Sequence, residues 1–243
     1  MNLARFEVGN HRGRLVPRVL GIALAAWLVV GILALARWLD TDQVGAAVGA
    51  ALVFAAGLVD DLAPVGPRGL RNHLRSLTSG HMTTGILKLV VTIGSAVLGV
   101  ALLDRGAGVD RLAAVIMVAG LTNVWNGLDV RPGRALKVFI LSTLLIALFA
   151  AGSTVIVAVL LPAAVVALWF DLQERAMLGD AGANMLGFSM GMALAGSLPV
   201  SALWSAALVA VALNVVGETV TFSRVIEAAP PLRWFDRLGR IPG

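Results

Sequence analysis

The chain alternates eight apolar runs with short charged connections, and this alternation limits the fold more than any other feature. A helix of about 17 to 25 apolar residues is long enough to cross a bilayer. Helices suit the hydrocarbon layer because they satisfy their own backbone hydrogen bonds. We therefore predict an all-α, polytopic transmembrane helix bundle of about eight spans. The expected spans are residues 16–36, 44–59, 84–103, 112–124, 135–151, 154–170, 183–198 and 201–217.

The composition excludes several other classes of protein. The 243 residues are 58% hydrophobic and only 14% charged, which is too apolar for a soluble domain of this size. The absence of cysteine excludes disulfides, thiolate metal sites and cysteine nucleophiles. We expect one integral membrane domain over residues 1–243, with a basic N-terminal segment at 1–15 and a C-terminal tail at 218–243. The N-terminus has no cleavable signal pattern, so we expect it to be retained.

The distribution of basic residues predicts the orientation of the bundle. Short connections force successive spans to alternate in direction, so every second connection lies on the same side. One side then carries all but three of the 19 Lys and Arg residues, the exceptions being Arg37, Arg105 and Arg111. The positive-inside rule assigns the basic side, with both termini, to the cytoplasm. The net charge of +5 is thus a topology signal, and we expect no nucleic-acid partner.

Acidic and amide side chains gather at the predicted cytoplasmic ends of three runs. Separately, each stretch has an ordinary explanation: a helix end, amides that tie helices together, or a turn. Together they bring costly carboxylates from distant parts of the chain to one membrane face, which favours a site for a metal ion and a phosphate-rich ligand. The residues are Asp60 and Asp61 after the second run, Asn123, Asn126 and Asp129 after the fourth, and Asp180 before the seventh.

The chemistry of phosphoryl transfer uses this combination of side chains. Mg²⁺ prefers carboxylate, amide and phosphate oxygens, and phosphoryl transfer depends on positioning and charge neutralisation. Basic residues on the same side are candidates for phosphate binding, although they also serve as topology markers. We expect His73 and His81 in the following loop to be solvated, with a role in the site as the alternative. The basic candidates are Arg14, Arg71, Arg75, Lys88, Arg131, Arg134 and Lys137.

The motifs resemble those of the polyprenyl-phosphate N-acetylhexosamine-1-phosphate transferase family. The likeness runs from about Asn10 to about Gly187, and the order and spacing of the motifs agree with the family pattern. It implies transfer of a sugar 1-phosphate from a UDP-sugar to polyprenyl (undecaprenyl) phosphate, with release of UMP, at the bacterial inner membrane. The motifs are Asp60-Asp61, Asn123-x-x-Asn126-x-x-Asp129 and Gly179-Asp180-Ala-Gly182.

The resemblance also implies roles for individual residues. Asp60 or Asp61 would engage the carrier phosphate. Which of the two does so, and whether it acts as a general base, is left open. Asp129 would complete the catalytic site around the diphosphate, and Asp180, with Asp129, would hold Mg²⁺. The implied substrate-binding residues are Asn123, Asn126, Lys88, Arg71, Arg75 and Arg14.

The chain departs from the family pattern in four places, one of which is Ala183 where the family has a serine after the glycine. We expect the family's first helix, which precedes the basic loop, to be missing. Asp129 is not followed by the usual second aspartate. The histidine-rich C-terminal loop has no counterpart, and its place is taken by a tail with Trp234 and Phe235, which we interpret as an interfacial anchor or a polar lid. The alternative function is a catalytically inactive relative that binds polyprenyl phosphate or an envelope-assembly partner. An ion transporter fits less well, because transporter acids lie near the bilayer midplane. A homodimer is compatible with the sequence.

Overall fold

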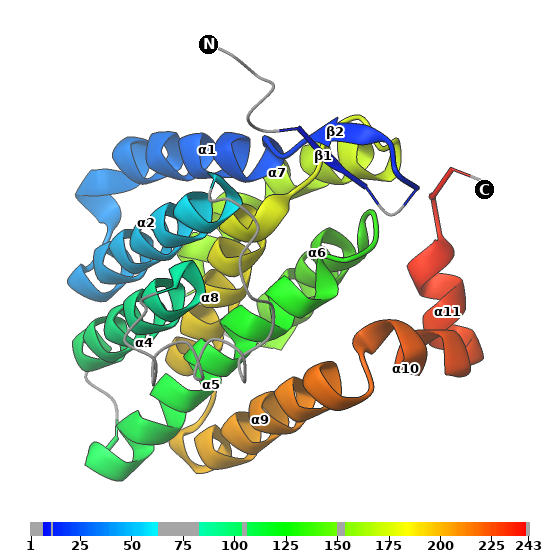
Figure 1. Ribbon diagram of the computed structural model, residues 1–243. Coiled ribbons are helices and arrows are strands. Elements are labelled where there is room, and N and C mark those ends of the chain that lie inside the picture. The colour runs from blue at the N-terminus through cyan, green and yellow to red at the C-terminus, as the bar shows by residue number, and fades with distance from the viewer. Residues whose placement is uncertain (1–6, 11, 63–82, 104–105, 150–153, 242–243) are drawn as a thin grey trace.

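The structure is a computed structural model that describes residues 7–10, 12–62, 83–103, 106–149 and 154–241 (Figure 1). The described chain is a helix bundle with one short β-hairpin and two short 3₁₀ helices, Ala36–Trp38 and Val200–Ala202. The elements are β1 (Glu7–Gly9), β2 (Leu15–Pro17), α1 (Leu20–Leu35), α2 (Thr41–Leu62), α4 (Thr84–Leu102), α5 (Gly108–Leu128), α6 (Arg134–Phe149), α7 (Val155–Leu172), α8 (Gly179–Ser197), α9 (Leu203–Thr219), α10 (Phe222–Ala228) and α11 (Pro230–Arg237).

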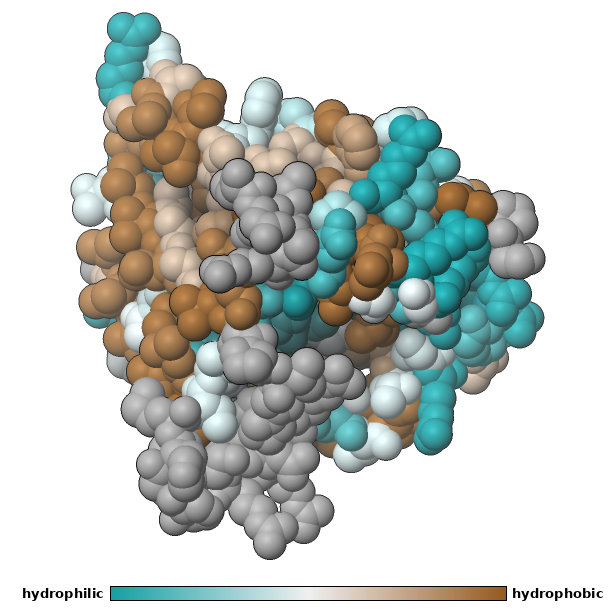
Figure 2. Space-filling model, turned by 45° about the horizontal axis from the view of Figure 1, so that its top comes forward, coloured by the Kyte–Doolittle hydropathy of each residue, from teal (hydrophilic) through white to brown (hydrophobic). Residues whose placement is uncertain are grey.

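The helices confirm the predicted all-α, polytopic bundle. In the described ranges, six helices are long and apolar enough to cross a membrane: α1, α2, α4, α5, α7, and α9 together with the 3₁₀ turn before it. The remaining two expected spans correspond to α6 and α8. Large hydrophobic side chains are exposed along the outer helices, as a bilayer requires. Figure 2 shows such residues over one side of the view, while hydrophilic residues gather at the opposite side.

Helix α8 forms the centre of the bundle. Nearly every residue from Gly179 to Gly196 is buried, and α8 packs chiefly against α2 and α5. A Cβ atom at Gly187 would lie 2.8 Å from the carbonyl oxygen of Leu121, and one at Gly191 would lie 2.8 Å from the Cα of Val118. The two glycines therefore allow the backbones of α5 and α8 to touch, as small residues at four-residue spacing commonly do in membrane helices.

The N-terminal segment folds as a hairpin, which the sequence did not indicate. Strands β1 and β2 pair antiparallel with Val8 opposite Val16, so α1 begins at Leu20 instead of at residue 16. Three contacts hold the hairpin to the connection between α7 and α8, and in one of them the amide of Met177 donates to the carbonyl of Pro17 at 2.9 Å. Asn10 Nδ2 donates to Glu174 at 2.9 Å, and Arg12 Nε lies 3.2 Å from the same carboxylate.

The polar groups collect at one end of the bundle. Contacts at that end join the C-terminal ends of α2, α5, α7 and α9 to the N-terminal ends of α1, α4, α6 and α8, as alternating spans require. The hairpin and the two tail helices lie at this end as well (Figure 1). We call it the charged end.

Candidate functional site

Lys88 lies between two carboxylates that come from distant parts of the chain. Its Nζ atom is 3.1 Å from Oδ2 of Asp60 at the end of α2, and 2.7 Å from Oδ2 of Asp180 at the start of α8. The hydroxyl of Thr84 also donates to Asp60. The side chains of Asp60 and Asp180 remain 23% and 36% exposed, so a ligand can reach both. Three helices thus build one accessible charged cluster.

Asp61 has a different environment from its neighbour Asp60. Its side chain is only 4% exposed and accepts hydrogen bonds from the backbone amides of Asp180 and Ala181, at 3.1 and 2.9 Å. The guanidinium of Arg18 donates to the same carboxylate at 2.8 Å. Asp61 therefore caps the N-terminus of α8 from another helix, where a negative charge is stabilising. The geometry assigns it a structural task.

The position before Asp180 requires a glycine, Gly179. Its φ is +73°, and a Cβ atom there would lie 2.8 Å from Oδ2 of Asp61. Both the backbone conformation and the lack of space favour glycine. The cap starts α8 at Gly179, four residues before the expected span, so Asp180 lies in the first helical turn and not in a loop.

Asp129 lies apart from the Lys88 cluster. It follows α5 and lines a small cavity of about 20 Å³ together with Asn10, Asp171 and Glu174. Burial raises the pKa of Asp129 well above its ordinary value, and the carboxylates of Asp171, Asp180 and Asp61 raise it further. The carboxyl group therefore holds its proton more strongly than an exposed aspartate. Among the described contacts, none joins Asp129 to Lys88.

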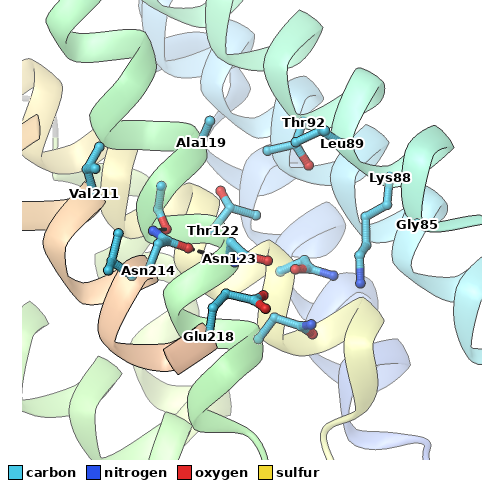
Figure 3. A pocket seen from close by; sticks show the side chains of 14 residues that line it. Gly85, Lys88, Leu89, Thr92, Ala119, Thr122, Asn123, Val211, Asn214 and Glu218 are labelled. Carbon is cyan, nitrogen blue, oxygen red and sulfur yellow. Dashed lines mark hydrogen bonds between the residues drawn. The ribbon is translucent and has the colours of Figure 1, made fainter. Parts of the chain in front are cut away.

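The amide side chains line a larger cavity of about 420 Å³ between α4, α5, α8 and α9 (Figure 3). Asn123 donates to Asn214 Oδ1 at 2.6 Å, which ties α5 to α9. Asn126 Oδ1 and Asn184 Nδ2 are buried without a hydrogen-bond partner in the structure. Such orphaned groups are costly and favour a ligand that satisfies them. Lys88 also lines this cavity, so the charged cluster stands at its edge.

Three lining residues with amide or carboxylate side chains were not predicted from the sequence: Asn184, Asn214 and Glu218. Asn184 follows Asp180 by four residues on α8, and Glu218 follows Asn214 by four residues on α9. In a helix this spacing places both members of a pair on one face. This spacing could have predicted that the pairs share a helix face. The pattern of apolar runs, however, does not distinguish a polar residue that faces a cavity from one that ties helices together.

The residues predicted to bind phosphate do not all lie in the charged cluster. Lys88 lies in the cluster, whereas Arg14 is exposed and immediately precedes β2 in the hairpin. Arg71 and Arg75 lie outside the described residues, as do His73 and His81.

Arg134 and Lys137, for which the sequence left phosphate binding and topology marking open, are bound to the tail. Arg134 donates to both oxygens of Asp236, at 2.8 and 3.1 Å. Lys137 Nζ donates to the backbone carbonyls of Phe235, Asp236 and Leu238, at 2.7 to 3.1 Å. Both side chains are buried, so their charges serve the docking of α11.

The donor set of the cluster is compatible with Mg²⁺. Asp60 and Asp180 offer hard carboxylate oxygens, and Mg²⁺ is commonly held by one or two carboxylates together with substrate phosphates and water. Within the described ranges, no group of three or more acidic or histidine side chains forms a complete protein cage. The residues present therefore fit a metal that arrives with a phosphate ligand.

A comparison with known protein families finds a match to glycosyl transferase family 4 over residues 43–197, more than half of the chain. The chain belongs to glycosyl transferase family 4. The match includes Asp60, Lys88, Asp129 and Asp180, and it confirms the resemblance drawn from the motifs. No curated protein matches the chain.

Membership of glycosyl transferase family 4 fixes the general activity. Together with the apolar helices, it identifies a multi-pass membrane transferase of sugar phosphates. The matched region extends from α2 to the end of α8. Glu218 and the tail helices lie beyond it, so the family match carries no information about that part of the cavity.

Proposed function

We propose that this protein transfers a sugar 1-phosphate from a UDP-sugar to polyprenyl (undecaprenyl) phosphate, at the cytoplasmic face of the bacterial inner membrane. The supporting observation is the placement of Lys88, Asp60 and Asp180 at the edge of the 420 Å³ cavity. Apolar side chains line other parts of the cavity wall, including Leu89, Val211 and Val215. One cavity thus combines a phosphate-binding charge with an apolar surface for a lipid.

The reaction requires one bond to form and one to break. An oxygen of the carrier phosphate attacks the β-phosphorus of the UDP-sugar and forms a new phosphoanhydride bond. The bond from the β-phosphorus to the oxygen bridging the two phosphates breaks, and UMP leaves with that electron pair. The product is a polyprenyl diphosphate sugar. Catalysis depends mainly on alignment and on neutralisation of the phosphate charges.

The cluster residues supply those two requirements. Lys88 is a mobile point charge that reorients from the carboxylates to phosphate oxygens when substrate enters. Asp180 and Asp60 would hold Mg²⁺, and Asp60 accepts any proton that remains on the carrier phosphate. When bound, Mg²⁺ supplies charge neutralisation for the diphosphate. The charge of Asp129 interacts with that of Asp180 and so shapes the field around it.

UMP release tests the proposal. Purified protein receives undecaprenyl phosphate, Mg²⁺ and either UDP-N-acetylglucosamine or UDP-N-acetylmuramoyl-pentapeptide. We expect Asp180→Asn to abolish release with at least one donor. Asp40→Asn is the matched control, because Asp40 is exposed at the opposite end of the bundle. Undiminished release by Asp180→Asn would remove that residue from the site. Absence of release by folded wild-type protein with every donor would favour the inactive, lipid-binding relative.

A further inference from the structure

A second cavity of about 240 Å³ adjoins the first at the charged end. It lies between the last turns of α5 and α9 and the start of α10. The two cavities share lining residues, so a ligand at Lys88 can extend into the second one. The shared residues are Asn123, Asn126, Asn214 and Glu218, and the second cavity adds Gly127, Val130, Gly217, Thr221, Phe222 and Ser223.

Glu218 points into this shared space. It lies in the last turn of α9 on the face that also carries Val211, Asn214 and Val215, all of which line the larger cavity. Figure 3 shows the Glu218 carboxylate directed inward, across from Lys88. An exposed carboxylate and a lysine thus face one cavity from opposite walls.

The remaining polar groups are held in fixed positions. Asn214 accepts from Asn123 and donates to the carbonyls of Gly120 and Ala210, at 2.9 and 2.8 Å. The orphaned Oδ1 of Asn126 is available for a donor from a ligand. Among the described lining residues of the second cavity there is no lysine, arginine or histidine. The surface therefore offers hydrogen bonds and one negative charge.

The walls of the second cavity are built by close contacts. The ring of Phe222 lies against Gly127 of α5 and Gly217 of α9, where added Cβ atoms would be 2.8 and 3.0 Å from it. Thr221 has a φ of +71°, an unfavourable conformation for a threonine that turns the chain at the end of α9. Because this conformation is costly, the packing around Thr221 must maintain it, and the same packing fixes the shape of the cavity wall.

We propose that the second cavity binds the sugar of the donor and that Glu218 selects sugars without a carboxylate. This inference rests on the proposed function, in which the diphosphate lies at Lys88. A neutral hexose or amino sugar offers hydroxyl or amide donors to Glu218 and Asn126. An acidic sugar places a second carboxylate beside Glu218 with no cation on the described lining to compensate. Such like-charge contact is an effective means of rejecting a ligand.

Two donors that differ at one carbon test the selection. UDP-N-acetylglucosamine carries a hydroxymethyl group at C6, and the corresponding uronic acid donor carries a carboxylate there; the two are otherwise identical. We expect wild-type protein to prefer the neutral donor by about tenfold or more, both in Kd from calorimetry and in kcat/KM from UMP release. Glu218→Gln keeps the shape and removes the charge, so the preference should fall to within about threefold.

Glu227→Gln is the matched control. Glu227 lies on α10, is paired with Arg237 at 2.8 Å, and does not line either cavity. It should retain the wild-type preference. Equal binding of both donors by wild-type protein, or an unchanged preference in Glu218→Gln, would overturn the inference. Lack of UMP release from every donor would refute the proposed function, while the binding preference would still decide the role of Glu218.

Discussion

Asp60 and Asp61 show how two adjacent carboxylates acquire different tasks. Asp61 accepts from two backbone amides and from Arg18, and it is almost fully buried. Asp60 faces Lys88 and keeps part of its surface open to a ligand. The sequence left the choice between them open because both follow the same apolar run. The difference arises from α8, which lies about 120 residues further along the chain.

Alanine substitutions separate these tasks. Asp61→Ala removes the cap of α8 and leaves Arg18 without its carboxylate partner, so we expect a loss of about 2 kcal/mol in stability. Asp60→Ala should leave the thermal unfolding temperature nearly unchanged while lowering kcat at least about a hundredfold. Unfolding in detergent and UMP release measure the two effects. Equal losses of stability in both variants would contradict the assignment.

Lys88 competes with any cation for the same two carboxylates. Lys88→Met removes the ammonium and keeps most of the side-chain volume. We expect the Mg²⁺ concentration for half-maximal activity to fall several-fold, because Asp60 and Asp180 lose their internal cation, while kcat falls at least about tenfold. A Mg²⁺ titration of UMP release measures both. A higher Mg²⁺ requirement in the variant would show that Lys88 assists the metal and does not compete with it.

At the scale of elements, the tail is a docked pair of helices, and an ion pair between Arg134 and Asp236 joins α11 to the bundle. Burial raises the pKa of Asp236, but hydrogen bonds and charge from Arg134, followed by the charge of Arg240, outweigh it, and the net pKa lies below the ordinary value. The ionised form therefore stabilises docking. This contribution is fully present above the unfolded-state pKa of about 4 and is lost as the pH falls through the folded-state pKa.

Asp236→Ala tests this docking. The variant leaves the buried guanidinium of Arg134, and that of Arg240, without their carboxylate partner, which costs about 3 to 5 kcal/mol. We expect faster hydrogen exchange in residues 222–237 and little change in α2 or α8. In wild-type protein, the same increase should appear below about pH 4. Glu227→Ala removes an exposed ion pair and should cost less than about 1 kcal/mol. Equal exchange in both variants would contradict the role of Asp236.

The elements also show what sequence patterns can and cannot supply. Apolar runs located the spans. The start of α8 was wrong by four residues, because its cap is supplied by Asp61 of another helix. The ion pair of Arg134 and Asp236 joins residues 102 positions apart, and no local periodicity reports such a contact. The hairpin depends similarly on Glu174, far along the chain.

At the scale of the whole molecule, all the groups assigned to substrate lie at the charged end. The sequence predicts that this end faces the cytoplasm, where UDP-sugars are made. The chain contains no cysteine, so a single introduced cysteine reports its own side. Arg224 is exposed on α10 at the charged end, and Asp40 is exposed at the other.

Labelling with a membrane-impermeant maleimide tests this orientation. We expect Arg224→Cys to react only in inverted vesicles and Asp40→Cys only in right-side-out vesicles. Detergent should make both cysteines reactive, which controls for burial. The reverse pattern would place the charged cluster outside the cell and would contradict the proposed donor.

The most direct measurement follows the β-phosphorus of the donor. UDP-N-acetylglucosamine, or another donor accepted in the UMP assay, is labelled at that atom and incubated with undecaprenyl phosphate, Mg²⁺ and either wild-type protein or Asp180→Asn. We predict that the label moves to the lipid fraction with wild-type protein and stays in the nucleotide fraction with the variant. If the sugar moves to the lipid while the label remains in UDP, the protein transfers a sugar without its phosphate, and the account of the site is wrong.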